Sequence, residues 1–316
     1  MFIAGAMLSV ASGSPADIPT VPICTSDKSA CYKMPVVGAG SCCGTYNISS
    51  WLALGGIHID TSCDYGSQPT IATAVQNSNV PRANLWVTSK LNVESCATNM
   101  TAALYELVLN PLQMSYVDLL LIHHAGRWET DNNPHPPCFD ASLANGNGTY
   151  YNCRMQTVLA MEAIVKAGLA RTWGVSNWQV RDLEQMYDMY GFYPAINQIE
   201  MHPWWKEDAV VAFCNKHGIL VEAYAPMGDG DRSHMRDAPI FAALAATHGV
   251  STGQIIMSYD LQSGADIVIP RSATPAHQVE NLNLFGPSGP IVVLNQTEVA
   301  AIASNHTYTK VCAWRQ

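Results

Sequence analysis

The sequence has few charged residues, and few of those are positive. Asp, Glu, Lys and Arg make up 13% of its 316 residues, and 25 acidic against 16 basic side chains give a formal net charge of −9. A chain with this balance lacks the basic face that nucleic acid or an anionic membrane surface requires. Hydrophobic residues make up 48% of the chain, too many for an intrinsically disordered protein. The composition therefore indicates a folded protein that does not bind nucleic acid.

Long apolar runs and metal-binding patterns are also missing. Beyond the N-terminus no run of about 18 uncharged apolar residues occurs, so we expect no membrane span. No Cys-x-x-Cys pair occurs, and no set of cysteines and histidines has the spacing of a zinc site. We therefore expect no bound metal.

The N-terminal tail, residues 1–22, begins with the uncharged apolar stretch Met1–Ser14. This stretch resembles the hydrophobic part of a secretory signal, although the usual basic residue before it is missing. A frayed or truncated tail is the alternative. Ten cysteines and several Asn-x-Ser/Thr sequons favour the secretory pathway or the extracellular space over the cytoplasm. The sequons begin at Asn47, Asn99, Asn147, Asn295 and Asn305.

The cysteines fall into two groups. Cys24 and Cys31, and likewise Cys138 and Cys153, lie in loop-like sequence and are candidate disulfide pairs. Cys63 and Cys214 lie in apolar surroundings, and we expect them to be buried thiols.

Short apolar runs alternate with longer amphipathic stretches through the rest of the chain. The predicted strands are residues 36–39, 57–60, 85–88, 117–122, 172–175, 195–199, 220–223 and 267–269. The predicted helices are residues 71–76, 101–109, 158–165, 180–189, 208–217, 239–248 and 252–261, the last with Ser251 as its N-cap. The runs VDLLLI and DIVI are apolar without alternation, as in strands buried on both faces.

Eight strands, each followed by helical sequence, predict parallel βαβ units. An open doubly wound sheet usually carries Gly-x-Gly-x-x-Gly after its first strand, but here Cys43 stands at the position of the third glycine. We therefore predict an α/β fold, a closed (β/α)8 TIM barrel with an N-terminal tail and a C-terminal loop. Residues 23–316 would form this single domain, with its active site at the C-terminal ends of the strands.

Residues 126–151 break this alternation. The segment is rich in Asn, Pro and Gly, and it is too long for an ordinary turn between strand and helix. Because it follows the fourth strand on the predicted catalytic face, we expect a loop over the active site. A glycosylated surface insertion carrying Asn147 is the alternative.

Four polar residues stand at or just beyond the ends of predicted strands: Asp60, Tyr65, Lys90 and His123. Each residue also has a purely structural explanation. Asp60 could cap a turn and Tyr65 could be a half-buried aromatic residue. Lys90 could be a solvated strand end, and His123 could be a histidine of the core. Their occurrence together after the second, third and fourth strands favours an active site.

The order of short motifs along the chain adds a family resemblance. From about Lys33 to Phe285 the sequence resembles the aldo-keto reductases, NAD(P)H-dependent barrels that reduce aldehydes and ketones. The motifs that carry the resemblance are MPVVGAG, IDTSCDYG, VTSKL, LLLIH, GVSNW, INQIEMHP, VEAYAPMG and IPRSATPAHQVENL.

The resemblance implies that Asp60, Tyr65, Lys90 and His123 form the family's catalytic tetrad. Tyr65 would protonate the alkoxide that hydride transfer produces, and His123 would orient the carbonyl oxygen. A phenol with a pKa near 10 is too weak an acid unless its anion is stabilised. The Lys90 ammonium would lower the pKa of Tyr65, and Asp60 would hold and balance Lys90.

The resemblance also implies a cofactor site for NADP(H), with NAD(H) as the alternative. Ser176, Asn177 and Gln198 would contact the nicotinamide carboxamide, and Tyr224 would stack on the nicotinamide ring. The adenosine half would be bound by Arg271, Ser272, Thr274, His277, Glu280 and Asn281. His277 departs from the family's arginine at that position, and a mostly neutral imidazole is a poorer ligand for the 2′-phosphate.

The substrate pocket is predicted with less detail. Many relatives carry a threonine and then an aromatic residue where this chain has Ser41, Cys42 and Cys43, so we expect a wider or differently filled pocket there. The candidate pocket residues are Cys42, His124, Trp128, Trp204, Cys312 and Trp314, although Trp204 has helix-entry packing as its alternative. We expect a monomer whose partner is a small carbonyl compound. A nucleotide-binding barrel that acts as a sensor or partner-binding module is the alternative function.

Overall fold

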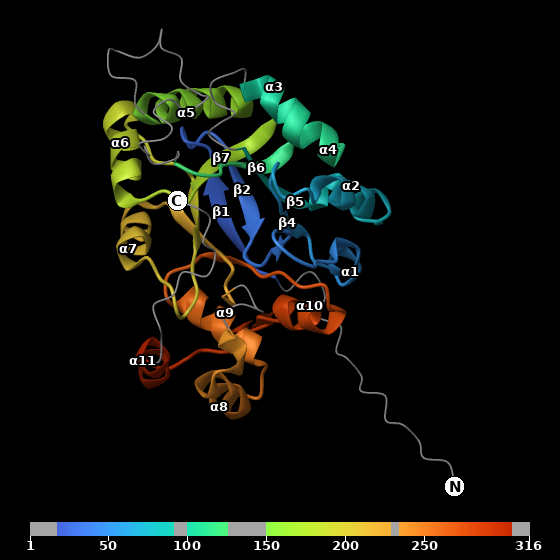
Figure 1. The fold of residues 1–316 in the computed structure, drawn as a ribbon, viewed down its shortest axis with the longest axis vertical. Coiled ribbons are helices and arrows are strands. Elements are labelled where there is room, and N and C mark those ends of the chain that lie inside the picture. The colour runs from blue at the N-terminus through green and yellow to red at the C-terminus, as the bar shows by residue number, and fades with distance from the viewer. Residues whose placement is uncertain (1–17, 92–99, 126–149, 229–233, 305–316) are drawn as a thin grey trace, which may run out of the picture.

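A computed structural model describes residues 18–91, 100–125, 150–228 and 234–304 (Figure 1). Eight strands form one parallel sheet in which each strand pairs with the next along the chain. They are β3 (Ala39–Gly40), β4 (His58–Asp60), β5 (Trp86–Leu91), β6 (Val117–Ile122), β7 (Ala170–Ser176), β8 (Ile196–Glu200), β9 (Leu220–Tyr224) and β10 (Ile267–Ile269).

The first and last strands of this sheet meet. Val37 forms a parallel bridge to Val268, whose N–H donates to the Val36 carbonyl at 3.0 Å. Gly38 donates back to Val268 and Gly40 to Pro270, each at 3.0 Å. The sheet is thus closed, and the predicted (β/α)8 barrel is confirmed.

Helices surround the barrel (Figure 1). They are α1 (Ile48–Ala53), α2 (Gln68–Gln76), α3 (Met100–Leu104), α4 (Asn110–Leu112), α5 (Tyr150–Lys166), α6 (Val180–Tyr190), α7 (Asp208–His217), α8 (Pro239–His248), α9 (Thr252–Gln262), α10 (Pro275–Leu282) and α11 (Gln296–Ser304). Between α3 and α4, residues Tyr105–Leu109 wind as a π-helical turn. Within the described residues no single helix is long and apolar enough to cross a membrane, although the bent pair of α8 and α9 meets that test by length and composition.

Local sequence sets several helix ends. The predicted N-cap Ser251 accepts a hydrogen bond from the Gln254 N–H at 3.3 Å, and the Gln254 side chain accepts one from the Ser251 N–H at 3.0 Å. Helices α7 and α8 end at Gly218 and Gly249, whose φ angles of 72° and 67° lie in the left-handed region. Glycine enters that region without the clash that other residues suffer there.

An N-terminal hairpin that the sequence did not predict closes one end of the barrel. Its antiparallel strands are β1 (Thr20–Cys24) and β2 (Cys31–Pro35), and Cys24 and Cys31 are paired in register and joined by a disulfide. Ile23 and Met34 are buried in a cluster with residues from the barrel strands. The cluster members from those strands are Trp86, Leu119, Leu121, Ile196, Ile267 and Ile269. The hairpin therefore covers the barrel interior at the end opposite the predicted active site.

The structure agrees with some of the expectations for the other cysteines and differs from others. Cys214 is buried, as expected, and burial raises the pKa of its thiol to about 11. Cys63 was expected to be buried too, but it is only half-buried, because it lies in the turn after β4 rather than in a strand. A second disulfide joins the adjacent Cys42 and Cys43, a pairing that the sequence did not predict. Cys138 lies outside the described residues.

Candidate active site

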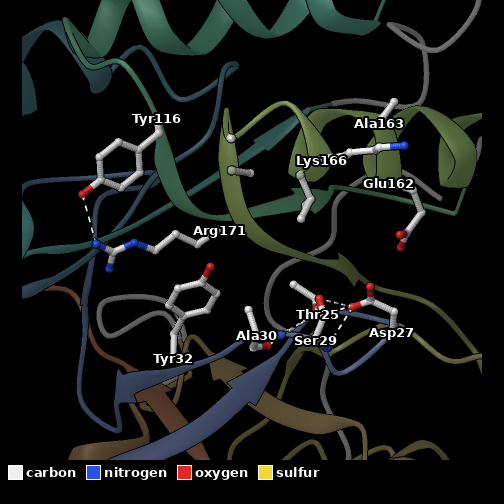
Figure 2. Close-up of a pocket in the computed structure, with 13 residues that line it drawn as sticks. Thr25, Asp27, Ser29, Ala30, Tyr32, Tyr116, Glu162, Ala163, Lys166 and Arg171 are labelled. Carbon is white, nitrogen blue, oxygen red and sulfur yellow. Dashed lines mark hydrogen bonds between the residues drawn. The ribbon is translucent and has the colours of Figure 1, made fainter.

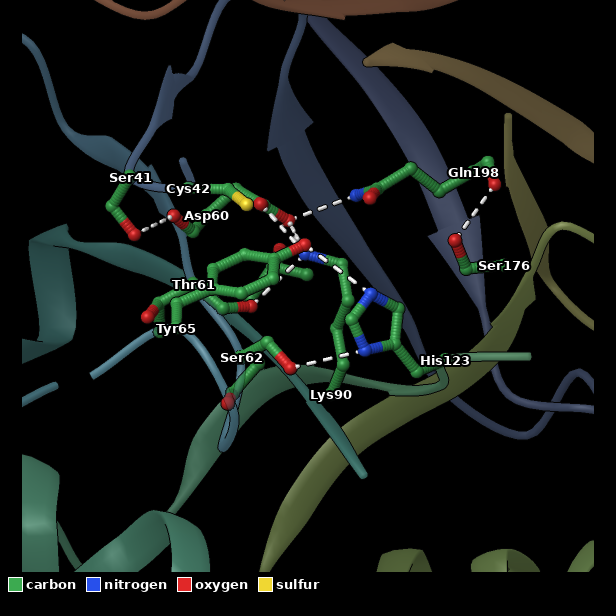
Figure 3. Close-up of polar contacts among 12 residues, drawn as sticks. Ser41, Cys42, Asp60, Thr61, Ser62, Tyr65, Lys90, His123, Ser176 and Gln198 are labelled. Atoms are coloured by element: carbon green, nitrogen blue, oxygen red, sulfur yellow. Dashed lines mark hydrogen bonds and ion pairs between the residues drawn. The ribbon is translucent and has the colours of Figure 1, made fainter. Parts of the chain in front are cut away.

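The centre of the site is a buried ion pair at the C-terminal end of the barrel (Figure 3). The Lys90 ammonium, on β5, donates to both oxygens of Asp60, on β4, at 2.7 and 2.8 Å. Its third hydrogen bond goes to the Thr61 carbonyl at 3.0 Å. Both residues are nearly inaccessible to solvent, at 0% exposure for Lys90 and 3% for Asp60. Every N–H of the ammonium has an acceptor, so the cation is held rigidly in place.

Tyr65 lies next to this cation, in the turn that follows β4. The Lys90 ammonium nitrogen is 4.9 Å from the centre of the Tyr65 ring, and the Tyr65 hydroxyl is 3.3 Å from Nε2 of His123 (Figure 3). A positive charge at this distance favours the phenolate form of a tyrosine over the phenol. The structure thus brings all four candidate catalytic residues together.

His123 is held from its other side by an acidic residue. Its Nδ1 atom is 3.4 Å from Asp64 Oδ1 and 3.2 Å from the Ser62 hydroxyl, which also donates to Asp64. Burial lowers the pKa of His123, and the Asp64 carboxylate opposes that shift. Asp64 itself is partly buried, which alone would raise its pKa, but its hydrogen bonds with His123 and Ser62 give a net lowering. Sequence reasoning missed Asp64, and its only signal was its position directly before Tyr65.

The residues expected at the nicotinamide lie beside the tetrad. The Asn177 amide donates to the His123 carbonyl at 3.0 Å, and its oxygen accepts from the Tyr224 hydroxyl at 2.9 Å. Ser176 donates to the Gln198 carbonyl at 2.9 Å. Three neighbouring strands, β7, β8 and β9, therefore hold these side chains in one connected arrangement.

A cleft of about 320 Å³ joins the tetrad to the residues expected at the adenosine half. From the candidate set it is lined by Cys42, Asp60, Tyr65, His123, Ser176, Asn177, Gln198, Tyr224, Arg271, Ser272, Thr274 and His277. Lys90 lies beneath the cleft, where it contacts Asp60. One cleft thus brings together most of the residues that the sequence assigned to two separate roles.

The remaining candidates within the described residues do not line the cleft. Glu280 and Asn281, on α10, do not line the cleft, and Asn281 is buried. His124 stacks on His123 with ring centres 4.4 Å apart, and its Nδ1 is 3.3 Å from the Asn177 amide nitrogen. Trp204 packs against a hydrophobic cluster that includes Met235 and Phe241. That contact agrees with the alternative of helix-entry packing. Trp128, Cys312 and Trp314, with most of the 126–151 segment and the C-terminal loop, lie outside the described residues.

Arg236 also lines the cleft, although sequence reasoning did not select it. Its side chain is half-buried and makes no hydrogen bond or ion pair with any residue in the described ranges. A guanidinium that lines a cleft can bind an anion there through charge-assisted hydrogen bonds. Its only sequence signal was a basic residue twelve positions after Tyr224 in a loop on the catalytic face.

A larger hollow, of about 820 Å³, lies between the N-terminal hairpin and α5 (Figure 2). Arg171 in this hollow is paired with Asp118 at 2.8 Å and donates to the Tyr116 hydroxyl at 3.2 Å. Asp27 accepts hydrogen bonds from Thr25 and Ser29. The tetrad is absent from its lining, and these polar groups already bind one another, so the smaller cleft is the better candidate site.

Comparison with known proteins agrees with this geometry. The model of the aldo/keto reductase family matches residues 48–304. Human aldo-keto reductase family 1 member A1 is 32% identical over 271 residues, which cover 80% of this chain and 82% of that protein. An aldo-keto reductase of Mycolicibacterium smegmatis is 30% identical over 284 residues, covering 88% and 89%. The crystal structure of an aldo/keto reductase from Brucella melitensis superposes with a TM-score of 0.73 at 29% identity, covering 91% and 99%.

Proposed function

Because the chain belongs to the aldo/keto reductase family, we propose that it reduces an aldehyde or ketone to an alcohol, with NADPH as its preferred hydride donor and Tyr65 as the general acid. The observation that carries this proposal is the buried Lys90 ammonium, held by Asp60 and 4.9 Å from the Tyr65 ring, at the floor of a cleft.

The residues of the cleft fit a nicotinamide dinucleotide. The half-exposed ring of Tyr224 offers a flat face to a neutral ring, and Asn177 and Gln198 offer amide groups to a carboxamide. Arg236 and Arg271 place two guanidinium groups in the same cleft, which suits phosphate. When bound, the dinucleotide would supply a hydride to the carbonyl carbon.

The chain's own residues then handle the proton. The Tyr65 hydroxyl and His123 Nε2 are 3.3 Å apart, so a carbonyl oxygen placed against both would lie within hydrogen-bond distance of each. As negative charge develops on that oxygen, Tyr65 gives up its proton, and the nearby Lys90 ammonium stabilises the phenolate left behind. His123 and Asn177, linked through the His123 carbonyl, fix the direction from which the oxygen is held.

The Tyr65→Phe variant tests the assignment of the acid. It removes one hydroxyl, so we expect turnover to fall by about 10²–10⁴-fold while the Kd for NADPH stays within about twofold. NADPH oxidation with a panel of aldehydes and ketones would measure turnover, and fluorescence titration would measure binding. Near-normal turnover of this variant would refute the role of Tyr65. If the wild-type protein binds NADPH but none of the tested carbonyls leads to NADPH oxidation, the sensor alternative would be favoured.

The preference for NADPH over NADH depends on the two arginines. Because a guanidinium binds phosphate better than an imidazole does, Arg236 rather than His277 would supply the second positive charge for phosphate. We expect Arg236→Leu to weaken NADPH binding by about tenfold. If Arg236 contacts the 2′-phosphate, the Arg236→Leu variant should bind NADH as tightly as the wild type does. An equal loss of affinity for both nucleotides would instead place Arg236 at the pyrophosphate. Lys216→Leu, which removes an exposed cation from α7, is the matched control for charge alone.

A further inference from the structure

A second carboxyl group lies inside the barrel behind Asp60. Glu222, on β9, has no solvent exposure. The amide nitrogen Nε2 of Gln198, on β8, donates to Asp60 Oδ2 at 2.8 Å and to Glu222 Oε2 at 2.7 Å. An amide nitrogen has only two hydrogens, and both are used here. The amide oxygen of Gln198 therefore points away from the two carboxyl groups, on a side chain that lines the cleft.

The other oxygen of Glu222 faces a histidine. His58 Nδ1 is 3.0 Å from the Pro35 carbonyl, which can only accept, so Nδ1 carries the ring's hydrogen and Nε2 presents a lone pair. Glu222 Oε1 is 3.6 Å from that Nε2 and has no other hydrogen-bond partner within the described residues. The same Nε2 lies 3.5 Å from the Thr88 hydroxyl, and a proton on Oε1 would let that oxygen donate toward Nε2 as well. The geometry is that of a neutral carboxylic acid beside a neutral imidazole.

The surrounding charges agree with this protonation state. The charged or titratable groups that face Glu222 are Asp60, Lys90 and His58. Burial, and then the Asp60 carboxylate, raise the pKa of Glu222 to about 8. Burial also lowers the pKa of His58 to about 4. With Glu222 and His58 neutral, the charges that face them are those of the Asp60–Lys90 ion pair.

We propose that Glu222 is a positioning residue which, as a neutral acid, holds the Gln198 amide so that its oxygen faces the nicotinamide carboxamide of the cofactor. The inference rests on the proposed function, because it needs a nicotinamide in the cleft. Without Glu222 the Gln198 nitrogen keeps Asp60 as its acceptor among the described residues, and one hydrogen bond instead of two holds the amide in this orientation. Its nitrogen would then face the cleft in part of the molecules, and the hydrogen bond to the carboxamide would be lost.

The binding test compares two ligands that differ in the nicotinamide. NADPH carries it, whereas 2′,5′-ADP has only the phosphorylated adenosine half. We expect Glu222→Leu to weaken NADPH binding by about 5–30-fold and to leave 2′,5′-ADP unchanged. Glu222→Gln keeps an acceptor for Gln198 and a donor for His58, so its affinities should stay within about twofold. Glu200→Gln is the matched control, because Glu200 is equally buried on β8 but bonds to His202.

The protonation state has its own test. A carboxyl with a raised pKa in the folded state contributes stability that is complete at low pH and is lost as pH rises to about 8. The Tm of Glu222→Gln relative to wild type should therefore increase from about pH 5 to about pH 9. This measurement decides the question even if Glu222→Leu does not fold.

The outcomes separate the two proposals. Equal loss of NADPH and 2′,5′-ADP binding in Glu222→Leu, or a Tm difference for Glu222→Gln that does not change with pH, would overturn the role of Glu222. Wild-type protein that binds 2′,5′-ADP no more weakly than NADPH would instead count against the proposed function, because nicotinamide would then make no contact.

Discussion

Replacing Lys90 with methionine should destabilise the folded protein strongly, although Lys90 is a candidate catalytic residue. Methionine keeps most of the length and apolar bulk of the side chain, so packing around the stem changes little. The substitution removes the ammonium that donates to both Asp60 oxygens and to the Thr61 carbonyl. Asp60 would remain buried, with Gln198 as its remaining side-chain donor among the described residues.

The size of the effect follows from that uncompensated charge. Removing one partner of a buried ion pair typically costs about 3–5 kcal/mol, because the other charge stays out of water. Asp60→Asn should cost a similar amount, since it leaves the Lys90 cation without its counter-charge. The double variant has no buried charge at this position, so its loss should be smaller than the sum of the two single losses by at least about 2 kcal/mol.

Urea unfolding followed by circular dichroism would measure these free energies of unfolding. Lys166→Met is the matched control, because Lys166 is exposed on α5 and should change stability by no more than about 0.5 kcal/mol. A cost below about 1 kcal/mol for Lys90→Met, or strict additivity in the double variant, would show that the pair is hydrated or loosely held. The reasoning about a rigid, dry cation beside Tyr65 would then fail.

Two further predictions concern other buried positions. Asp260, on α9, is fully buried, neither of its carboxylate oxygens has a partner within the described residues, and burial raises its pKa well above the usual value. Because a raised pKa means that stability is lost as pH rises, Asp260→Asn should increase Tm, and more at about pH 8 than at about pH 4; a gain independent of pH would contradict this. Gly174→Ala would place a Cβ 2.4 Å from Ile196 Cγ2 and 2.7 Å from its carbonyl oxygen, so we expect a loss of about 1–3 kcal/mol in thermal or urea unfolding. Gly286→Ala, whose nearest new contact would be 3.9 Å away, is its control, and equal effects of the two would refute the clash.

Local signals in the sequence were sufficient for the elements of the barrel. The unbroken apolar runs at 117–122 and 267–269 are strands with those bounds, and helices 208–217 and 239–248 end where Gly218 and Gly249 follow them. The N-terminal hairpin was missed because its strands have little apolar alternation and are stabilised by contacts with barrel residues far along the chain.

In the active site, too, residues with a local sequence signal were predicted, and residues that depend on distant neighbours were missed. Ordered motifs indicated the tetrad, and the structure brings its members together. Asp64, Glu222 and Arg236 were not selected, because their significance depends on neighbours distant in sequence. Asp64 matters because it contacts His123, and Glu222 matters because it lies between Gln198 and His58. No periodicity or spacing along one segment carries that information.

The hairpin formed by β1 and β2 fills the end of the barrel opposite the cleft. Ile23 and Met34 are buried there among apolar side chains of the barrel strands, whereas the cleft lies at the end that carries the Asp60–Lys90 pair. A ligand that fills the cleft would separate that pair from the solvent there for as long as the ligand stays bound. The rate of proton exchange between this pair and the solvent at the cleft would then be set by the binding and release of the ligand, and not by the faster motions of the chain.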